Sequence, residues 1–256
     1  MHMRKMLYAM MMALILMVDH TAYAQEWWIG LRGGPSIPHL SDGGNEVSKG
    51  YSSIVAPNFG LMVEYYFTHN VSVQFEVDYS GQGGERDGLQ PITQSPEGLP
   101  PLPEGQYLYA DFKDKSVLNY LEIPIIGKYQ FDLYDHWHPF IEAGPYIGFL
   151  LNATEKTSGT SQIYVDHNRT PLTIDGQPVP PVSFDADTNV KGDLNEVNAG
   201  IMAGGGIAYV INSLNQIFID IRGEYGLRSV QKNTARDGSS NTGCAVFLVG
   251  YKYKIR

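Results

Sequence analysis

Beyond its first residues the chain has no apolar run long enough to form a membrane-spanning helix, which needs about 20 consecutive residues. It holds one cysteine, Cys244, so it cannot form an internal disulfide. Its net charge of −9 is the opposite of the basic excess that nucleic-acid binding requires. These absences exclude a helical membrane bundle, a disulfide-stapled fold and a nucleic-acid partner.

The N-terminus has the pattern of a secretory signal peptide. An arginine and a lysine precede an apolar stretch that is too short to anchor the chain in a bilayer, and the small residues Ala22 and Ala24 follow it. We therefore expect residues 1–24 to be a signal peptide, cleaved between Ala24 and Gln25. The rest of the chain, 25–256, is expected to be a single domain.

Two segments alternate apolar and polar residues almost without a break, at 71–80 and 217–228. Successive side chains of a strand point to opposite faces, so each segment has one apolar and one charged face. Strands in globular proteins are usually about 3–10 residues long, whereas a tilted membrane-spanning strand needs roughly 9–11. The alternation therefore predicts strands whose apolar face meets lipid and whose charged face lines a lumen.

Eight such segments can be recognised, and short and long connections alternate between them. Outer-membrane barrels have this asymmetry, with tight periplasmic turns and long extracellular loops. A soluble barrel would also alternate, but the aromatic residues here gather toward the segment ends, as in membrane-interface girdles. We predict an all-β fold, an eight-stranded antiparallel up-and-down transmembrane β-barrel with long, mobile extracellular loops. The segments are 26–34, 53–67, 71–81, 115–131, 139–153, 196–211, 216–230 and 243–255.

The longest connection, 154–195, contains two short apolar stretches at 163–165 and 172–176. Neither is long enough to cross a bilayer. We expect them to form a short hairpin above the membrane surface.

One strand carries a family resemblance. At Tyr120-Leu121-Glu122-Ile123-Pro124 the chain resembles the outer-membrane β-barrel family common in Bacteroidetes, described as porin-like or PorT-like; 29–34 and 248–253 also look like it. The resemblance implies an eight-stranded barrel in the bacterial outer membrane without a catalytic motif. Such barrels often end in an aromatic residue that the assembly machinery reads. This chain ends in Lys254-Ile255-Arg256, so the expected signal is either Tyr253 or a different kind of signal altogether.

The charged faces of the segments predict a cross-strand network in the lumen. Buried charges need partners, and eight strands leave an interior just wide enough for side chains to fill. A closed, plugged lumen is therefore favoured over a narrow conducting channel. Arg222 and Arg228 are expected to pair with acids such as Glu76, Glu122 and Glu142. The predicted network is Arg32, Glu64, Glu76, Asp78, Glu122, Lys128, Glu142, Asp220, Arg222, Glu224 and Arg228.

Two other chemistries are weaker. An outer-leaflet lipid-modifying enzyme would need a Ser or His with an orienting carboxylate at the rim. Asp166-His167 is the nearest match, but the sequence does not place a Ser partner such as Ser161 beside it. The loop 185–196 has oxygen ligands at calcium-loop spacing, but Val190 stands where that loop needs glycine. We therefore predict no catalytic residue, cofactor or metal, and expect either a structural role or a binding role through the long extracellular loops. The expected partners are outer-membrane lipid, the barrel assembly machinery and an extracellular ligand or protein.

Overall fold

The computed structural model describes residues 26–41, 43, 45–92, 102–103, 106–133 and 135–256. The predicted signal peptide and its cleavage site at Ala24 and Gln25 lie outside the described residues. In the part that is described, no helix is long and apolar enough to cross a bilayer.

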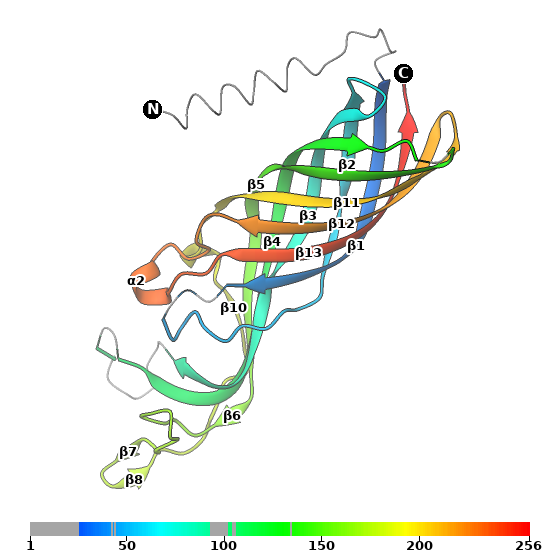
Figure 1. The fold of residues 1–256 in the computed structure, drawn as a ribbon. Coiled ribbons are helices and arrows are strands. Elements are labelled where there is room, and N and C mark those ends of the chain that lie inside the picture. The colour runs from blue at the N-terminus through cyan, green and yellow to red at the C-terminus, as the bar shows by residue number, and fades with distance from the viewer. Residues whose placement is uncertain (1–25, 42, 44, 93–101, 104–105, 134) are drawn as a thin grey trace, which may run out of the picture.

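Eight long strands close into a ring in which every neighbouring pair is antiparallel (Figure 1). Each strand pairs with the next along the chain, β5 pairs with β11, and β13 returns to β1. The predicted fold class, an eight-stranded antiparallel barrel, is confirmed. The strands are β1 (Glu26–Leu40), β2 (Ala56–Tyr66), β3 (Val71–Ile92), β4 (Leu108–Gln130), β5 (Trp137–Ser158), β11 (Val197–Asn212), β12 (Asn215–Gly226) and β13 (Thr242–Lys254).

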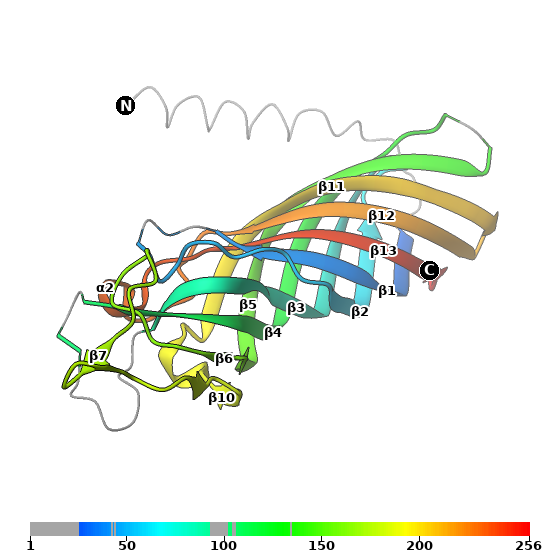
Figure 2. The ribbon, with the colours of Figure 1, turned by 90° about the horizontal axis from the view of Figure 1, so that it is seen from below.

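The two ends of the barrel differ. The connections β2–β3, β4–β5 and β11–β12 are short. They lie at the end of the barrel where β1 begins and β13 finishes, which we call the short-turn end. All other connections are at the opposite, long-loop end. Figures 1 and 2 show the strands tilted relative to the barrel axis, as ring closure requires.

Four strands are longer than their sequence patterns predicted: β1 has 15 residues and ends at Leu40 rather than at residue 34, and three others extend further. β3, β4 and β5 have 22, 23 and 22 residues and project beyond the ring at the long-loop end (Figure 1). Their extra residues stay paired, with 81–92 of β3 opposite 108–119 of β4. These residues do not alternate between apolar and polar because they lie outside the membrane. Prediction from the alternation therefore placed the ends of these strands too early. Two strands are shorter than predicted: β12 stops at Gly226 and not at residue 230, and β2 covers Ala56–Tyr66 and not 53–67.

The projecting strands and the 154–195 connection form a folded extracellular part, which we call the head. Its short elements are β6 (Thr160–Ser161), β7 (Thr173–Ile174), β8 (Gln177–Pro178), β9 (Val182–Ser183), β10 (Ala186–Asn189) and the 3-10 helix η1 (Lys191–Asp193). A further short helix, α2 (Thr234–Asp237), lies between β12 and β13.

The head has an apolar core of its own, so the 154–195 connection is packed together, where we expected a mobile loop with a single hairpin. The hairpin predicted between 163–165 and 172–176 is reduced to a bridge between Tyr164 and Pro171; the hairpin that forms instead is β7–β8, whose turn has Asp175 and Gly176 at positive φ of 50° and 78°. Residues from β3, β4 and the connection pack together beneath it. The core comprises Ile92, Leu108, Ala110, Phe112 and Ile163, with Leu102, Leu172, Val179, Val182 and Phe184 packed against them.

The wall of the barrel is polar inside and apolar outside. On β12, Asp220, Arg222 and Glu224 are buried, whereas Ile219 and Ile221 between them are 56% and 52% exposed. Aromatic rings contact one another around the short-turn end, in the pairs Trp27–Tyr65, Tyr65–Phe67, Tyr129–Phe131 and Trp137–Tyr209. This distribution agrees with an outward face that meets lipid.

Ile221→Arg tests the outward face. An arginine near the middle of the lipid-facing band should destabilise the inserted barrel by about 2–4 kcal/mol. The heat-modifiable gel shift of the refolded protein should then be lost or much reduced.

Ile174→Arg is the matched control, because Ile174 is 49% exposed but lies in the head hairpin. It should fold like the wild type. Normal folding of both variants would contradict the assigned face.

Candidate functional site

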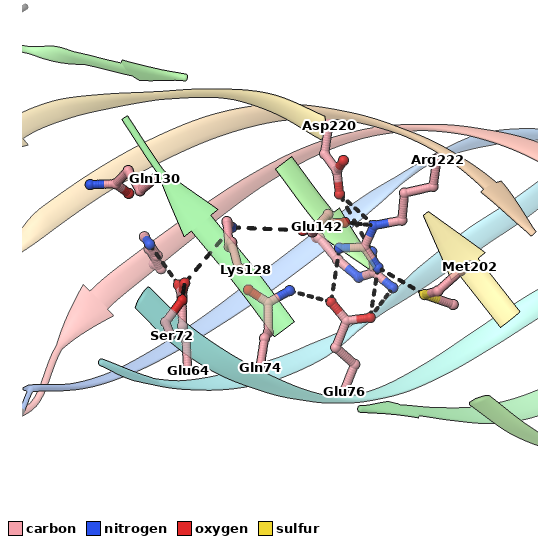
Figure 3. Close-up of polar contacts among 12 residues, drawn as sticks. Glu64, Ser72, Gln74, Glu76, Lys128, Gln130, Glu142, Met202, Asp220 and Arg222 are labelled. Atoms are coloured by element: carbon pink, nitrogen blue, oxygen red, sulfur yellow. Dashed lines mark hydrogen bonds and ion pairs between the residues drawn. The ribbon is translucent and has the colours of Figure 1, made fainter. Parts of the chain in front are cut away.

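The centre of the lumen is a network of ion pairs around Arg222 (Figure 3). Arg222 Nη1 and Nη2 donate to the two carboxylate oxygens of Glu76 at 2.8 and 3.0 Å, across the lumen from β12 to β3. Its Nε donates to Asp220 Oδ2 at 2.6 Å and contacts the Glu142 carboxylate of β5. One guanidinium therefore ties together three strands that are distant in the sequence.

Arg32 of β1 extends this network. Its Nη2 lies 2.5 Å from Glu76 Oε2 and 2.5 Å from Asp78 Oδ2, so Glu76 is shared by two arginines. The close approach of Asp78 depends on Gly60 of β2, where a Cβ atom would lie 1.9 Å from Asp78 Oδ1. Gly60 interrupts the row of inward side chains and leaves space for the pair.

A second cluster lies nearer the short-turn end. Lys252 Nζ donates to Glu64 Oε2 at 2.6 Å and to the Tyr66 hydroxyl at 2.9 Å. Lys128 lies 3.9 Å from both Glu64 and Glu142 and therefore joins this cluster to the central network. Lys252 is 1% exposed and was missing from the predicted network, although its outward neighbours Tyr251 and Tyr253 indicate an inward position.

Toward the long-loop end the lumen contains carboxyl groups without cationic partners. Glu122 and Glu224 are 1% and 6% exposed, and within the described residues no lysine or arginine lies within 4.0 Å of either. The Gln82 amide donates weakly to Glu224 Oε2 at 3.5 Å. The expected pairing of Glu122 with an arginine is therefore not present.

Arg228 requires a correction. It lies beyond the end of β12, is exposed, and donates to the Val197 carbonyl oxygen at 3.3 Å and to Asn195 Oδ1 at 3.4 Å. Strand alternation placed it in the lumen, but alternation ceases where the strand ends at Gly226. The other predicted network residues are buried inside the barrel: Arg32, Glu64, Glu76, Asp78, Glu122, Lys128, Glu142, Asp220, Arg222 and Glu224.

An apolar layer, which we call the mouth cluster, lies between this network and the long-loop end. It joins inward residues of β1, β4 and β5 to residues of two connections, which are themselves bridged between Leu194 and Gln231. Because its members come from separate loops and strands, no local pattern in the sequence marks them. The mouth cluster is Leu40, Leu118, Tyr120, Leu150, Ala153, Leu194 and Val230, with Tyr51 and Val190 packed against it.

The residues considered for catalysis do not form a triad. His167 contacts Glu46 at 3.3 Å and packs on Tyr109, whereas Asp166 accepts hydrogen bonds from Thr170 and from the Asn168 backbone. The Ser161 hydroxyl donates to the Gln162 carbonyl oxygen. Asp166, His167 and Ser161 are therefore each engaged by different partners.

The acidic loop considered for calcium is also internally occupied. Asp185 accepts from the Gly159 backbone and from Ser183, and Asp187 lies 3.7 Å from Lys156. Within the described ranges no three His, Cys, Asp or Glu side chains gather closely enough to hold a metal ion.

In the head, a hydrogen bond links the 43–52 loop to β4. The Tyr109 hydroxyl donates to Glu46 Oε2 at 2.6 Å, and this bond holds the pKa of Glu46 below its usual value of 4.5. Nearby, Arg169 makes two bonds to Asp111, at 2.9 and 2.8 Å, which lower the pKa of that carboxyl.

Arg222→Ala tests the central network. The change would leave Glu76, Glu142 and Asp220 buried without their shared cation, and loss of one partner of a buried ion pair costs about 3–5 kcal/mol. We expect a clear drop in the stability of the refolded barrel, measured by denaturant titration with the gel shift as readout.

Arg228→Ala is the matched control, because it removes an exposed arginine on the same segment. It should change stability by less than about 0.5 kcal/mol. Equal stability of the two variants would contradict a structural role for the network.

The Glu46 contact predicts a pH dependence. A carboxyl whose folded pKa is lowered stabilises the contact above about pH 4.5 and loses that contribution as the pH falls through the lowered pKa. The NMR titration midpoint of the Glu46 carboxyl should therefore lie below 4.5 and rise in Tyr109→Phe. An unchanged midpoint in Tyr109→Phe would show that this hydrogen bond is not the cause.

Many solved structures are similar to this chain at low identity, and three outer-membrane proteins among them serve as examples. Neisserial surface protein A is 12% identical over 90% of this chain and 99% of its own, with a TM-score of 0.42. OprG from Pseudomonas aeruginosa is 11% identical over 90% of this chain and 96% of its own, with a TM-score of 0.40. The outer membrane protease OmpT from Escherichia coli is 8% identical over 93% and 100%, with a TM-score of 0.41.

No curated protein sequence matches the chain. Residues 23–232 match the family described as outer membrane protein beta-barrel domain, and this range includes most of the ring. The chain therefore belongs to the outer membrane protein beta-barrel family, which confirms the predicted location in the bacterial outer membrane.

Proposed function

We propose that this protein is a non-catalytic outer-membrane barrel with a closed lumen, which binds an extracellular ligand or protein through its head. The observation that carries this proposal is the pair of seals inside the barrel. Arg222 and Arg32 bridge strands across the lumen, and the mouth cluster covers the lumen toward the extracellular end. A scaffold closed in this way leaves the head as the part available for binding.

The alternative of a narrow channel is less well supported. Ions need a continuous hydrated path, but Glu64, Glu76, Arg222 and Lys252 are each at most 2% exposed. Their charges are used in direct ion pairs across the lumen, not held apart around water. An eight-stranded barrel has little room beyond its own side chains.

The alternative of a lipid-modifying enzyme is not supported by any Ser, His and carboxylate arrangement among the described residues considered for it. His69 and His138 both lie near Asp132 at the short-turn end, at 3.1 and 3.3 Å, which is the end away from the outer leaflet. In the head, His167 faces Glu46 and Tyr109 and not a nucleophile. The geometry therefore favours binding over catalysis.

The head has the properties of a binding module. Its apolar core and its paired strands hold it as a folded unit on three strands that continue from the barrel wall. Rigid support of this kind reduces the ordering entropy that binding would otherwise cost. Loops on a rigid scaffold are also where binding residues usually occur.

Three narrower expectations are part of the proposal. The strand Tyr120–Pro124 supports a PorT-like origin of the Bacteroidetes type. Residues 1–24 carry the export signal, and Tyr253 is the residue that the barrel assembly machinery reads.

Planar-bilayer recording tests the closed lumen. The refolded chain 25–256, with its gel shift verified first, should give no steady ion current, because both seals would have to open at once. Steady single-channel conductance in the wild type would overturn the closed-lumen proposal and favour the channel.

A further inference from the structure

Three cations at the extracellular rim of the barrel have no carboxylate partner. Lys115, Lys191 and Arg228 each lie near the upper end of β5, and within the described residues none of them is within 4.0 Å of an Asp or Glu oxygen. Other cations of the head are paired with carboxylates, namely Lys113 with Glu85, Lys156 with Asp187 and Arg169 with Asp111. The three unpaired charges therefore need a separate explanation.

Lys115 is placed against a like charge. The strand register sets it directly opposite Lys156 of β5, on the outer face. Its neighbour on the other side, Glu85 of β3, instead pairs with Lys113 at 3.4 Å, and Lys156 pairs with Asp187 at 3.7 Å. Like charges directly opposite one another destabilise a sheet, so an anion supplied from outside would be favourable here.

Lys191 and Arg228 use their donors on neutral oxygens. Lys191 Nζ donates to the Leu151 carbonyl oxygen of β5 at 3.0 Å. Arg228 donates to the Val197 carbonyl oxygen, and Val197 is paired with Phe149 of β5. Both cations are thus held at the level where the exposed apolar side chains Phe149 and Leu151 end the outward apolar row.

The height of these residues matches the lipid headgroups. The outward side chains of β4 are apolar as far as Leu121, and those of β5 as far as Leu151. With a rise of about 3.4 Å per residue and a strand tilt of about 45°, Lys115 lies about 14 Å beyond Leu121 along the barrel axis. Long basic side chains can bend back toward the headgroup level from such a position. The three cations therefore border the outer leaflet.

The arrangement is one-sided. At the corresponding level of β1 and β13 the outward residues carry no lysine or arginine, with Ile37 opposite Ala245 in the register. Before β2 the outward position is Val55, which is 74% exposed. If the rim cations served only to keep the surface hydrated, charged side chains would occur all round the rim. The three unpaired cations instead lie on one side of the barrel, near β5.

We propose that Lys115, Lys191 and Arg228 form a binding sector for the phosphate groups of an anionic lipid in the outer leaflet. Lysine and arginine bind phosphate oxygens through charge-assisted hydrogen bonds, and the apolar side chains Leu121, Phe149 and Leu151 beneath them would contact the acyl chains. Each basic residue near an anionic membrane surface contributes favourably to lipid attraction. This sector is separate from the closed lumen and lies at the base of the head, where the projecting strands leave the barrel wall.

The test compares lipid A with dephosphorylated lipid A as probes. The refolded chain in neutral detergent micelles is titrated with each lipid, and bound lipid is counted by native mass spectrometry. The wild type should bind lipid A at least about tenfold more tightly than the dephosphorylated lipid. The variant Lys115→Gln, Lys191→Gln, Arg228→Gln should lose this preference and keep its gel shift.

The control variant Lys49→Gln, Lys254→Gln, Arg256→Gln removes the same charge away from the sector and should keep the preference. Three results would overturn the proposal: no preference in the wild type, a preference unchanged in the sector variant, or an equal loss in both variants, which would indicate attraction by net charge alone. If the sector variant does not fold, the single change Lys115→Gln, which removes no ion pair found among the described residues, must still lower the preference.

Discussion

A chain that crosses a bilayer with strands must close its sheet, because lipid offers no hydrogen-bond partners to an open edge. Closure of β1 to β13 and of β4 to β5 meets this constraint, and each strand then has one face toward lipid and one toward the lumen. All polar side chains of the spanning segments must share the lumen. The charged interior of this protein is therefore a consequence of its closed ring.

The lumen resolves this crowding by pairing charges across the barrel. Glu76 is shared by Arg32 and Arg222, and Lys128 connects the central network to Glu64 and Lys252. Such bridges replace the water that a wider barrel would contain. Toward the extracellular end the cations run out, and the mouth cluster replaces charge with apolar packing. The two kinds of contact together support a lumen that is filled and closed.

The same strands also build the head, because β3, β4 and β5 continue beyond the lipid as a paired sheet. The head is thus rigidly attached, and its apolar core holds the long connection over that sheet. At the junction of barrel and head, the unpaired rim cations face the outer leaflet. Binding to lipid and binding to an extracellular partner would use different surfaces of one scaffold.

Strand alternation by itself determined which faces of the spanning segments point inward, as on β12, where Asp220, Arg222 and Glu224 are all buried. It also determined the number of strands, their antiparallel order and the ends that carry the long loops. These properties are local, since side-chain direction repeats every two residues and a short connection forces neighbouring strands to pair.

Only the tertiary structure decided which charges meet, where each strand ends and how the long connection folds. Arg228 continues the alternation in the sequence but lies outside the lumen, because β12 ends at Gly226 and the arginine belongs to the connection that follows. Glu122 faces the lumen as predicted yet finds no arginine, since the register and tilt of the ring determine which side chains share a level. The mouth cluster and the head core bring together residues that are far apart in the chain, and no periodic pattern records contacts of that kind.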